Sequence, residues 1–183
     1  MARILVTGGA GFIGSHIAAA LVAQGDQVVV LDDLSTGHER NLEAIGGSVE
    51  FVRGSVTDDV AVAKAVAGCD YVYHEAALAS VPRSIENPKA NNEANVAGTL
   101  NVCAAAHEAG VKRLIYAASS SAYGDSPSLP KVETMPTNPK SPYAIAKLAG
   151  EHYVSVYASV YGMQTLSIRY FNVFGPRQDP DSP

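Results

Sequence analysis

The chain has 183 residues, a formal net charge of −5 and an apolar fraction of 47%, which is enough for one domain with a sizeable core. The negative charge gives no electrostatic basis for binding nucleic acid. No apolar run approaches the roughly 18 residues of a membrane span, so no membrane association is expected. The chain enters a strand at once, so no signal peptide is expected. The isolated Cys69 and Cys103 are expected to be buried, reduced thiols of a cytoplasmic protein.

Apolar runs that do not alternate with polar residues predict strands that are buried on both faces. These runs lie at residues 2–7, 27–31, 49–53, 70–74, 112–118 and 164–170. Helices are expected between them, at residues 12–24, 58–67, 84–109 and 143–161. The alternation of strand and helix predicts an α/β fold, a doubly wound parallel sheet with helices on both faces.

The first strand leads into a glycine-rich turn and then a helix. Gly8, Gly11 and Gly14 form a variant of the spacing that binds dinucleotides. Such glycines allow a tight turn, a close approach of the backbone to a pyrophosphate, and close packing of helix on strand. The helix start offers unpaired N–H groups and a partial positive charge to the phosphates. The motif therefore predicts dinucleotide binding.

An acidic pair follows the second strand. Asp32 stands eighteen residues after Gly14, where a carboxylate can accept hydrogen bonds from the hydroxyls of an adenosine ribose. Asp33 adds a second carboxylate, and no arginine is adjacent. Two acids would repel a 2′-phosphate, so the sequence favours NAD over NADP.

A Tyr-x-x-x-Lys pair follows the long segment 119–141, which is rich in serine and proline and is expected to be a functional loop. Tyr143 and Lys147 lie at the start of a predicted helix, and their spacing places phenol and ammonium on one face. A neighbouring ammonium favours the phenolate. Such a tyrosine can take a proton from a substrate hydroxyl while hydride leaves the same carbon.

A serine run directly follows the fifth predicted strand. A hydroxyl of Ser119, Ser120 or Ser121 can hydrogen-bond the reacting hydroxyl and stabilise a developing oxyanion. The five histidines are scattered over different elements, so no metal site is expected. They are His16, His38, His74, His107 and His152.

These segments together resemble the extended short-chain dehydrogenase/reductase family, in particular its NAD-dependent sugar-nucleotide epimerases and dehydratases. The likeness is strongest to the UDP-hexose 4-epimerases, which act on UDP-glucose or UDP-N-acetylglucosamine. It spans residues 6–180. The segments that carry it are TGGAGFIGSH, LDDLSTGHERNL, HEAALASVPRS, AASSSAYGD, SPYAIAK and RYFNVFGPRQDP.

The resemblance implies a Rossmann-type domain over residues 1–175 that binds NAD. Residues 176–183 would begin a loop toward a C-terminal substrate lobe that this chain lacks. The cofactor-binding residues that it implies are Gly8, Gly11, Phe12, Ile13, Gly14, Asp32, Asp33, Ser35, Thr36, Gly37, Ser55, Val56, Ala76, Ala77, Asn95, Tyr143, Lys147 and Phe171.

Catalytic roles are implied in the same way. Tyr143 matches the general base, and Lys147 matches the lysine that binds the cofactor ribose and lowers the pKa of the tyrosine. Ser119 matches the catalytic Ser/Thr, although the serine repeat leaves open which hydroxyl reacts. The substrate-binding residues would be Ser80, Ser119, Ser120, Ser121, Tyr143 and Asn172.

The sequence departs from the family pattern in two respects. The family usually has Gly-Asp after the third strand, whereas this chain has Gly54-Ser55, so adenine would lose a charged partner. Family members also continue for over a hundred further residues, so the chain is expected to be a fragment or an unusually short member with little activity.

The resemblance predicts NAD-dependent 4-epimerisation of a UDP-hexose through a 4-keto intermediate. A 4,6-dehydratase or a decarboxylase is an alternative, but either would need an acidic side chain at Ser120 or Ser121. A third alternative is an NAD-binding module without turnover. The resemblance also implies a homodimer through helices 84–109 and 143–161, whose small apolar residues allow close approach.

Overall fold

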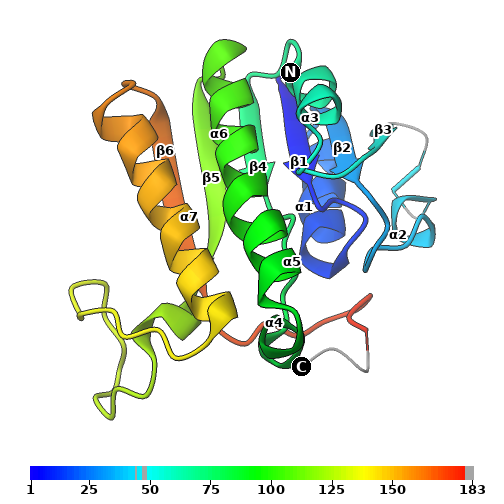
Figure 1. Cartoon of the computed structure of the whole chain (residues 1–183). Coiled ribbons are helices and arrows are strands. Elements are labelled where there is room, and N and C mark those ends of the chain that lie inside the picture. Colours follow the sequence, from blue (N-terminus) through cyan, green and yellow to red (C-terminus); the bar gives the residue numbers. More distant parts are fainter. Residues whose placement is uncertain (44, 47–48, 180–183) are drawn as a thin grey trace.

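The computed structural model describes residues 1–43, 45–46 and 49–179. Its strands are β1 (Arg3–Thr7), β2 (Gln27–Asp32), β3 (Val49–Arg53), β4 (Tyr71–His74), β5 (Arg113–Ser119) and β6 (Gln164–Tyr170). They form one parallel sheet in the order β3-β2-β1-β4-β5-β6 (Figure 1). The order reverses between β1 and β4, and a sheet of this kind binds ligands outside the carboxyl ends of its strands at that point.

The helices cover both faces of the sheet, as predicted. They are α1 (Phe12–Ala23), α2 (Arg40–Glu43), α3 (Asp59–Val66), α4 (Val81–Glu86), α5 (Pro88–Asn92), α6 (Gly98–Glu108) and α7 (Pro142–Ser159). The predicted α/β Rossmann-type fold is confirmed. The predicted strands agree with the observed ones within one residue at each end. The predicted burial on both faces holds for β1, β2 and β5. It is wrong for the edge strands β3 and β6, whose residues are mostly half-buried or exposed because each has a neighbouring strand on one side alone.

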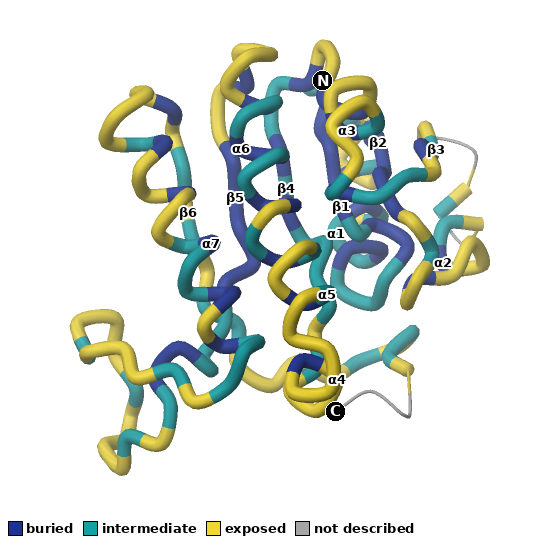
Figure 2. The backbone as a smooth tube through the Cα atoms, in the orientation of Figure 1, coloured by how far each residue is buried: buried dark blue, intermediate teal, exposed yellow. Residues whose placement is uncertain are grey.

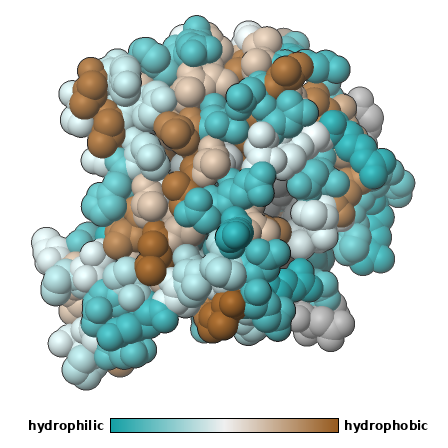
Figure 3. Space-filling view, in the orientation of Figure 1, coloured by the Kyte–Doolittle hydropathy of each residue, from teal (hydrophilic) through white to brown (hydrophobic). Residues whose placement is uncertain are grey.

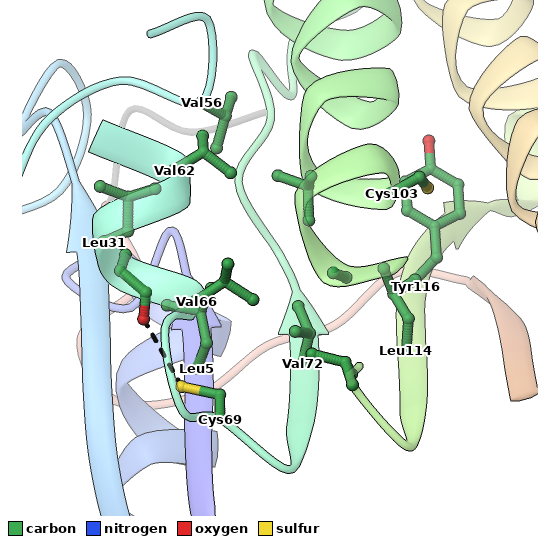
Figure 4. Close-up of a cluster of buried hydrophobic side chains, with 14 of the residues drawn as sticks. Leu5, Leu31, Val56, Val62, Val66, Cys69, Val72, Cys103, Leu114 and Tyr116 are labelled. Carbon is green, nitrogen blue, oxygen red and sulfur yellow. Dashed lines mark hydrogen bonds between the residues drawn. The ribbon is translucent and has the colours of Figure 1, made fainter. Parts of the chain in front are cut away.

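Alternate residues of the central strands enter two separate cores. Leu5 of β1 joins a cluster under α3, α6 and α7, whereas Ile4 and Val6 pack under α1. The dark blue strands in Figure 2 show this burial through the middle of the sheet. Figure 4 shows part of the larger cluster, in which Cys103 and Tyr116 lie together. The two cores hold the strand ends rigidly, and the site is built on those ends.

The predicted helix 84–109 is wrong as a single element. The structure has α4, a break at Asn87, then α5, a π-helical turn over Glu93–Ala97, and α6. Pro88 disfavours helical dihedrals at the residue before it, and Asn87 accordingly has φ −136° and ψ 77°. The Asn87 side chain caps the new helix by accepting a hydrogen bond from the Ala90 N–H (3.1 Å).

Smaller differences concern short elements. The sequence patterns did not indicate α2, which has only four residues. The predicted loop 119–141 contains a 3₁₀ turn over Ser120–Tyr123, and β5 itself extends to Ser119. The expected domain boundary near residue 175 stays a prediction. Of the expected loop 176–183, residues 180–183 lie outside the described residues.

Candidate active site

The loop between β1 and α1 is closely packed because two of its glycines leave no room for a side chain. Gly8 has a φ of +67°, and a Cβ atom there would lie 2.7 Å from the Ala76 backbone nitrogen. A Cβ atom on Gly14 would collide with the Gly8 carbonyl oxygen. Helix α1 begins after Gly11 with no side-chain cap from the described residues. The N–H groups of its first turn are therefore available to an anion.

Asp32 closes this loop from the end of β2. Its Oδ2 atom accepts a hydrogen bond from the Ala10 N–H (2.9 Å), and its Oδ1 atom accepts one from Leu34 (2.8 Å). Burial raises the pKa of Asp32, and these two donors oppose the rise. Asp33 is exposed and accepts a hydrogen bond from the Ser35 N–H (2.9 Å). Asp32 thus has a structural task that the sequence did not indicate.

Other predicted cofactor residues line the same edge of the sheet. Gly37 lies against the Asp32 carboxylate, and Val56 packs on Gly98, where a Cβ atom would come within 2.6 Å of it. The Ser55 hydroxyl accepts hydrogen bonds from the backbone and side chain of its neighbour Thr57. Phe12 and Ile13 are half-buried in the first turn of α1, and Ser35 and Thr36 are exposed after β2.

A chain of hydrogen bonds runs through the interior beneath Ala76. The Ala76 N–H donates to Thr7 Oγ1 (3.2 Å), which lies 2.7 Å from His74 Nδ1. His74 Nε2 lies 3.0 Å from Thr99 Oγ1, and Thr99 donates to the Asn95 carbonyl (2.8 Å). Because the Thr99 hydroxyl already donates to the Asn95 carbonyl, it can only accept from His74, so His74 donates from Nε2 and accepts at Nδ1. Burial lowers the pKa of His74 to about 3, so the ring is neutral.

Asn95 holds the segment after β4 at a second point. Its Oδ1 atom accepts from the Leu78 N–H (2.8 Å), while its Nδ2 atom donates to the Leu78 carbonyl (3.2 Å) and to Asn91 (3.1 Å). The side chain is buried in the π-helical turn. Asn95 therefore positions the loop that carries Ala76 and Ala77, and its predicted contact with a cofactor stays a prediction.

The start of α7 is fixed from two sides. Ser141 caps it by accepting a hydrogen bond from the Ala144 N–H (3.1 Å), and Pro142 takes the first helical position. The Tyr143 N–H donates to the hydroxyl of Ser84 (3.2 Å), a buried residue of α4. This arrangement places Tyr143 rigidly at the carboxyl end of β5.

Ser119 is the member of the serine run that influences the pKa of Tyr143. Its Oγ atom accepts hydrogen bonds from the N–H (3.2 Å) and the hydroxyl (2.8 Å) of Ser121. Its own proton therefore remains available for another oxygen. Burial raises the pKa of Tyr143, and hydrogen bonding from Ser119 opposes that rise. The expected lowering of this pKa by Lys147 stays a prediction.

Lys147 lies one turn after Tyr143 and is only 3% exposed. Its Nζ atom stands 4.4 Å from the ring centroid of Tyr116, whose hydroxyl donates to the Lys147 carbonyl (3.2 Å). Gly150 makes room for that hydroxyl, because a Cβ atom there would collide with it. Burial lowers the pKa of Lys147 to about 8, and the Glu75 carboxylate opposes this.

The predicted substrate-binding residues outside the serine run lie nearer the surface. Ser80 caps α4 by accepting a hydrogen bond from the Arg83 N–H (3.3 Å). Phe171 and Asn172 follow β6 and are exposed, with the Phe171 ring stacked on Tyr123 at a centroid distance of 6.4 Å. All three residues follow the carboxyl ends of strands, but they lie on different segments.

Sequence reasoning missed four supporting residues. Ser84 and Tyr116 act through contacts between distant segments, which no local pattern indicates. Gly150 interrupts a helix, and a glycine inside a helix is a visible signal of close packing. Glu75, a carboxylate directly after a buried strand, was also a visible signal.

The expectations on metals, membranes and cysteines can be compared with the described residues. No three His, Cys, Asp or Glu side chains gather there as a metal site requires. No helix in the described ranges has the length and apolar character to cross a membrane. Cys69 and Cys103 are buried and free, which agrees with the predicted thiols.

The comparison with protein families decides the wider assignment. The model of the "NAD dependent epimerase/dehydratase family" matches residues 4–183. The chain belongs to this family. Membership agrees with the glycine loop, the acid after β2 and the Tyr143–Lys147 pair described above.

This chain spans about 58% of the length of similar family members. A UDP-glucose 4-epimerase of Mycolicibacterium smegmatis is 43% identical over 97% of this chain and 58% of its own length. A structure of Thermus thermophilus UDP-glucose 4-epimerase in complex with NAD has 45% identity and a TM-score of 0.91, covering 98% and 58% of the two chains. The UDP-N-acetylglucosamine 4-epimerase from Methanobrevibacter ruminantium, in complex with UDP-N-acetylmuramic acid, has 39% identity and a TM-score of 0.94 over 100% and 58%.

Proposed function

We propose that this chain is the NAD-binding and catalytic part of a UDP-hexose 4-epimerase. The observation that most supports it is the approach of the Ser119 hydroxyl to Tyr143, at the sheet edge that also carries the glycine loop. A base and a hydroxyl donor at one point suit the removal of a proton from a sugar hydroxyl.

The residues at the β1–α1 loop fit NAD. The Gly8 backbone lies so close to Ala76 that a side chain at position 8 would not fit. A ligand can therefore approach the backbone of this loop closely. The uncapped start of α1 suits the pyrophosphate, and Asp32 and Asp33 suit an unphosphorylated ribose. When bound, NAD supplies the acceptor for hydride and its later donor. We assign the remaining NAD contacts to the other cofactor-binding residues that were predicted from the sequence.

Each catalytic side chain then has one task. The Tyr143 phenolate takes the proton of the sugar 4-hydroxyl, and it returns the proton after the 4-keto sugar has turned over in the site. Ser119 donates a hydrogen bond to the same sugar oxygen, and this bond strengthens as negative charge develops. The Lys147 ammonium stabilises the phenolate and binds a ribose hydroxyl. The remaining substrate contacts are assigned to Ser80, Ser120, Ser121 and Asn172.

Dehydration or decarboxylation fits the serine run less well. Both reactions need a carboxyl acid or base near the reacting hydroxyl, yet Ser120 and Ser121 occupy the positions beside Ser119. Ser121 is instead engaged in holding Ser119. This observation favours epimerisation, in which the same tyrosine serves both directions.

A binding module without turnover is the remaining alternative, because the chain spans 58% of the curated relatives' length. The test compares this chain with the same chain extended by the sequence that follows Pro183 in its gene. Calorimetry measures NAD binding, and a coupled assay measures interconversion of UDP-glucose and UDP-galactose, and of their N-acetyl forms. Binding by both proteins with turnover by the longer one supports the proposal. If the longer protein turns over none of the four sugars, the chain is a binding module without turnover.

The surface of α7 supports pairing with a second copy of the chain. Ile145, Tyr153 and Val156 of α7 and Val160 directly after it recur at helical spacing and are exposed, at 58%, 38%, 44% and 69%. Figure 3 shows brown apolar groups among polar ones on the face formed by α6 and α7. Burial of this stripe against the same stripe of a twofold-related copy would form the expected homodimer.

A further inference from the structure

Glu75 is a half-buried carboxylate that none of the steps above uses. It follows β4 directly, and its N–H donates to the Thr7 carbonyl (3.2 Å). Its Oε1 atom accepts a hydrogen bond from the hydroxyl of Tyr170 (3.3 Å), which ends β6. The two residues are 95 positions apart in sequence. The contact therefore spans the carboxyl edge of the sheet across the end of β5, the strand between β4 and β6.

Lys147 reaches the same edge from α7. Within the described part of the chain its ammonium forms no ion pair, and it lies 4.4 Å from the centroid of the Tyr116 ring. The sheet places Glu75 next to this ring. Tyr116 on β5 lies in register with His74 on β4, and their ring centroids are 5.6 Å apart. Glu75 follows His74 and crosses the end of β5 to reach Tyr170, while Tyr143 lies one turn before Lys147 on α7.

Glu75 is the carboxylate of this group, and Glu75 and Lys147 each favour the charged form of the other. Burial raises the pKa of Glu75 to about 7, and Lys147 and the Tyr170 hydroxyl both oppose the rise. Burial lowers the pKa of Lys147 to about 8, and Glu75 opposes that fall. His74 is neutral near pH 7 and adds no charge. The carboxylate thus favours the ammonium form near neutral pH.

We propose that Glu75, oriented by Tyr170, is a positioning residue that keeps the Lys147 ammonium protonated beside Tyr143. The functional meaning of this rests on the proposed epimerase chemistry, in which the ammonium stabilises the phenolate. Without Glu75, the buried amine loses its proton at a lower pH. Tyr143 then lacks its cation in the range where it must act as a base.

The titration of Lys147 tests this directly on the chain as it exists. The chain has six lysines, so ¹³C-lysine labelling gives few ε-carbon signals, and Lys147→Met identifies the one required. We expect a wild-type midpoint near 8 and a fall of about one pH unit in Glu75→Gln, the size expected for losing a nearby opposite charge. Tyr170→Phe removes the donor that keeps Glu75 charged, so it should lower the midpoint by a smaller amount.

Glu151→Gln is the matched control. It neutralises another partly buried carboxylate, which is bound by Arg169 at 2.7 and 2.9 Å. The Lys147 midpoint should not move in this variant. An unchanged midpoint in Glu75→Gln, or an equal fall in Glu151→Gln, would overturn the proposal. If Glu75→Gln does not fold, an unchanged midpoint in Tyr170→Phe overturns it equally.

A second readout uses the proposed cofactor. The ratio of the NAD dissociation constants at pH 8.5 and pH 6.5 should be several-fold larger in Glu75→Gln than in wild type or Glu151→Gln. Neither measurement depends on turnover. A failed epimerase assay would therefore contradict the proposed function while leaving the lysine titration to decide the role of Glu75.

Discussion

At the scale of single residues, His74 shows how surrounding donors and acceptors fix a side chain. Thr7 and Thr99 hold its two ring nitrogens, and the Ala76 N–H ends the chain of bonds at the loop of the glycine motif. The sequence indicated only that this histidine does not belong to a metal site. These hydrogen bonds join His74 to Thr7, 67 positions away, and to Thr99, 25 positions away. No local sequence pattern reveals such pairs.

We predict that His74 stays in the neutral Nε2–H tautomer down to about pH 4. Its folded pKa of about 3 lies below the usual 6.5. The unfolded chain therefore binds a proton first as the pH falls. The stability that this residue contributes is full above about pH 6.5 and is lost progressively toward pH 3. Long-range ¹H–¹⁵N spectra of the histidine rings check this, and a titration near pH 6.5 or an Nδ1–H tautomer would contradict it.

We predict that Asp33→Arg alone shifts cofactor preference toward NADP. Asp33 is exposed, so a guanidinium there could meet a 2′-phosphate, whereas Asp32 is needed to hold Ala10 and Leu34. Asp32→Ala would leave the buried Ala10 N–H without a partner, at a cost of about 1–3 kcal/mol in the free energy of unfolding, and would also release the half-buried Leu34 N–H.

Calorimetry with both cofactors measures the preference, and Asp59→Arg is the control. Asp59 is an exposed residue of α3, so the same change of charge there should leave the preference unaltered. Equal binding of NAD and NADP by the wild-type chain would show that the interpretation of this acidic pair is wrong.

At the scale of elements, sequence patterns predicted the strands well and the helix ends less well. Short apolar runs rich in β-branched residues, such as 28–31, favour a strand that is buried on both faces. The break at Asn87 could have been predicted, because Pro88 carries the signal. The π-helical turn that brings Asn95 to Leu78 could not, since it depends on the fit of α6 against the sheet.

We predict that Gly150→Ala destabilises the packing of α7 on β5 by about 1–3 kcal/mol. The added methyl group would collide with the Tyr116 hydroxyl, which bonds to the Lys147 carbonyl. Urea unfolding measures the loss. Removing that hydroxyl by Tyr116→Phe in the same chain should recover part of the stability. If Gly150→Ala and Tyr116→Phe lower the free energy of unfolding additively, the added methyl group does not collide with the Tyr116 hydroxyl.

At the scale of the whole molecule, we predict a dimer that Val156→Glu breaks. The substitution places a charge in the apolar stripe of α7, where burial without a partner is unfavourable. Sedimentation velocity at micromolar concentrations measures the mass. Glu108→Gln, a change at an exposed residue near the end of α6, serves as the control. A wild-type chain that is monomeric across this range would contradict the dimer for the described portion.

The candidate site is a mixture of what the sequence could and could not predict. The spacing of Tyr143 and Lys147 placed both on one helix face, and the serine run marked the end of the neighbouring strand. The sequence did not separate Ser119 from its neighbours. In the structure Ser121 donates to Ser119, which leaves the proton of Ser119 available, and the choice of the reacting hydroxyl stays a prediction.

The central claim is that the Tyr143 phenol is the base, and turnover by Tyr143→Phe in a protein with a complete second lobe tests it most directly. The loss of a general base reduces turnover by about 10²- to 10⁴-fold, and NAD binding should persist because the ring remains. Tyr153→Phe, on the exposed side of the same helix, should keep wild-type turnover. Turnover by Tyr143→Phe equal to that of wild type would contradict the account.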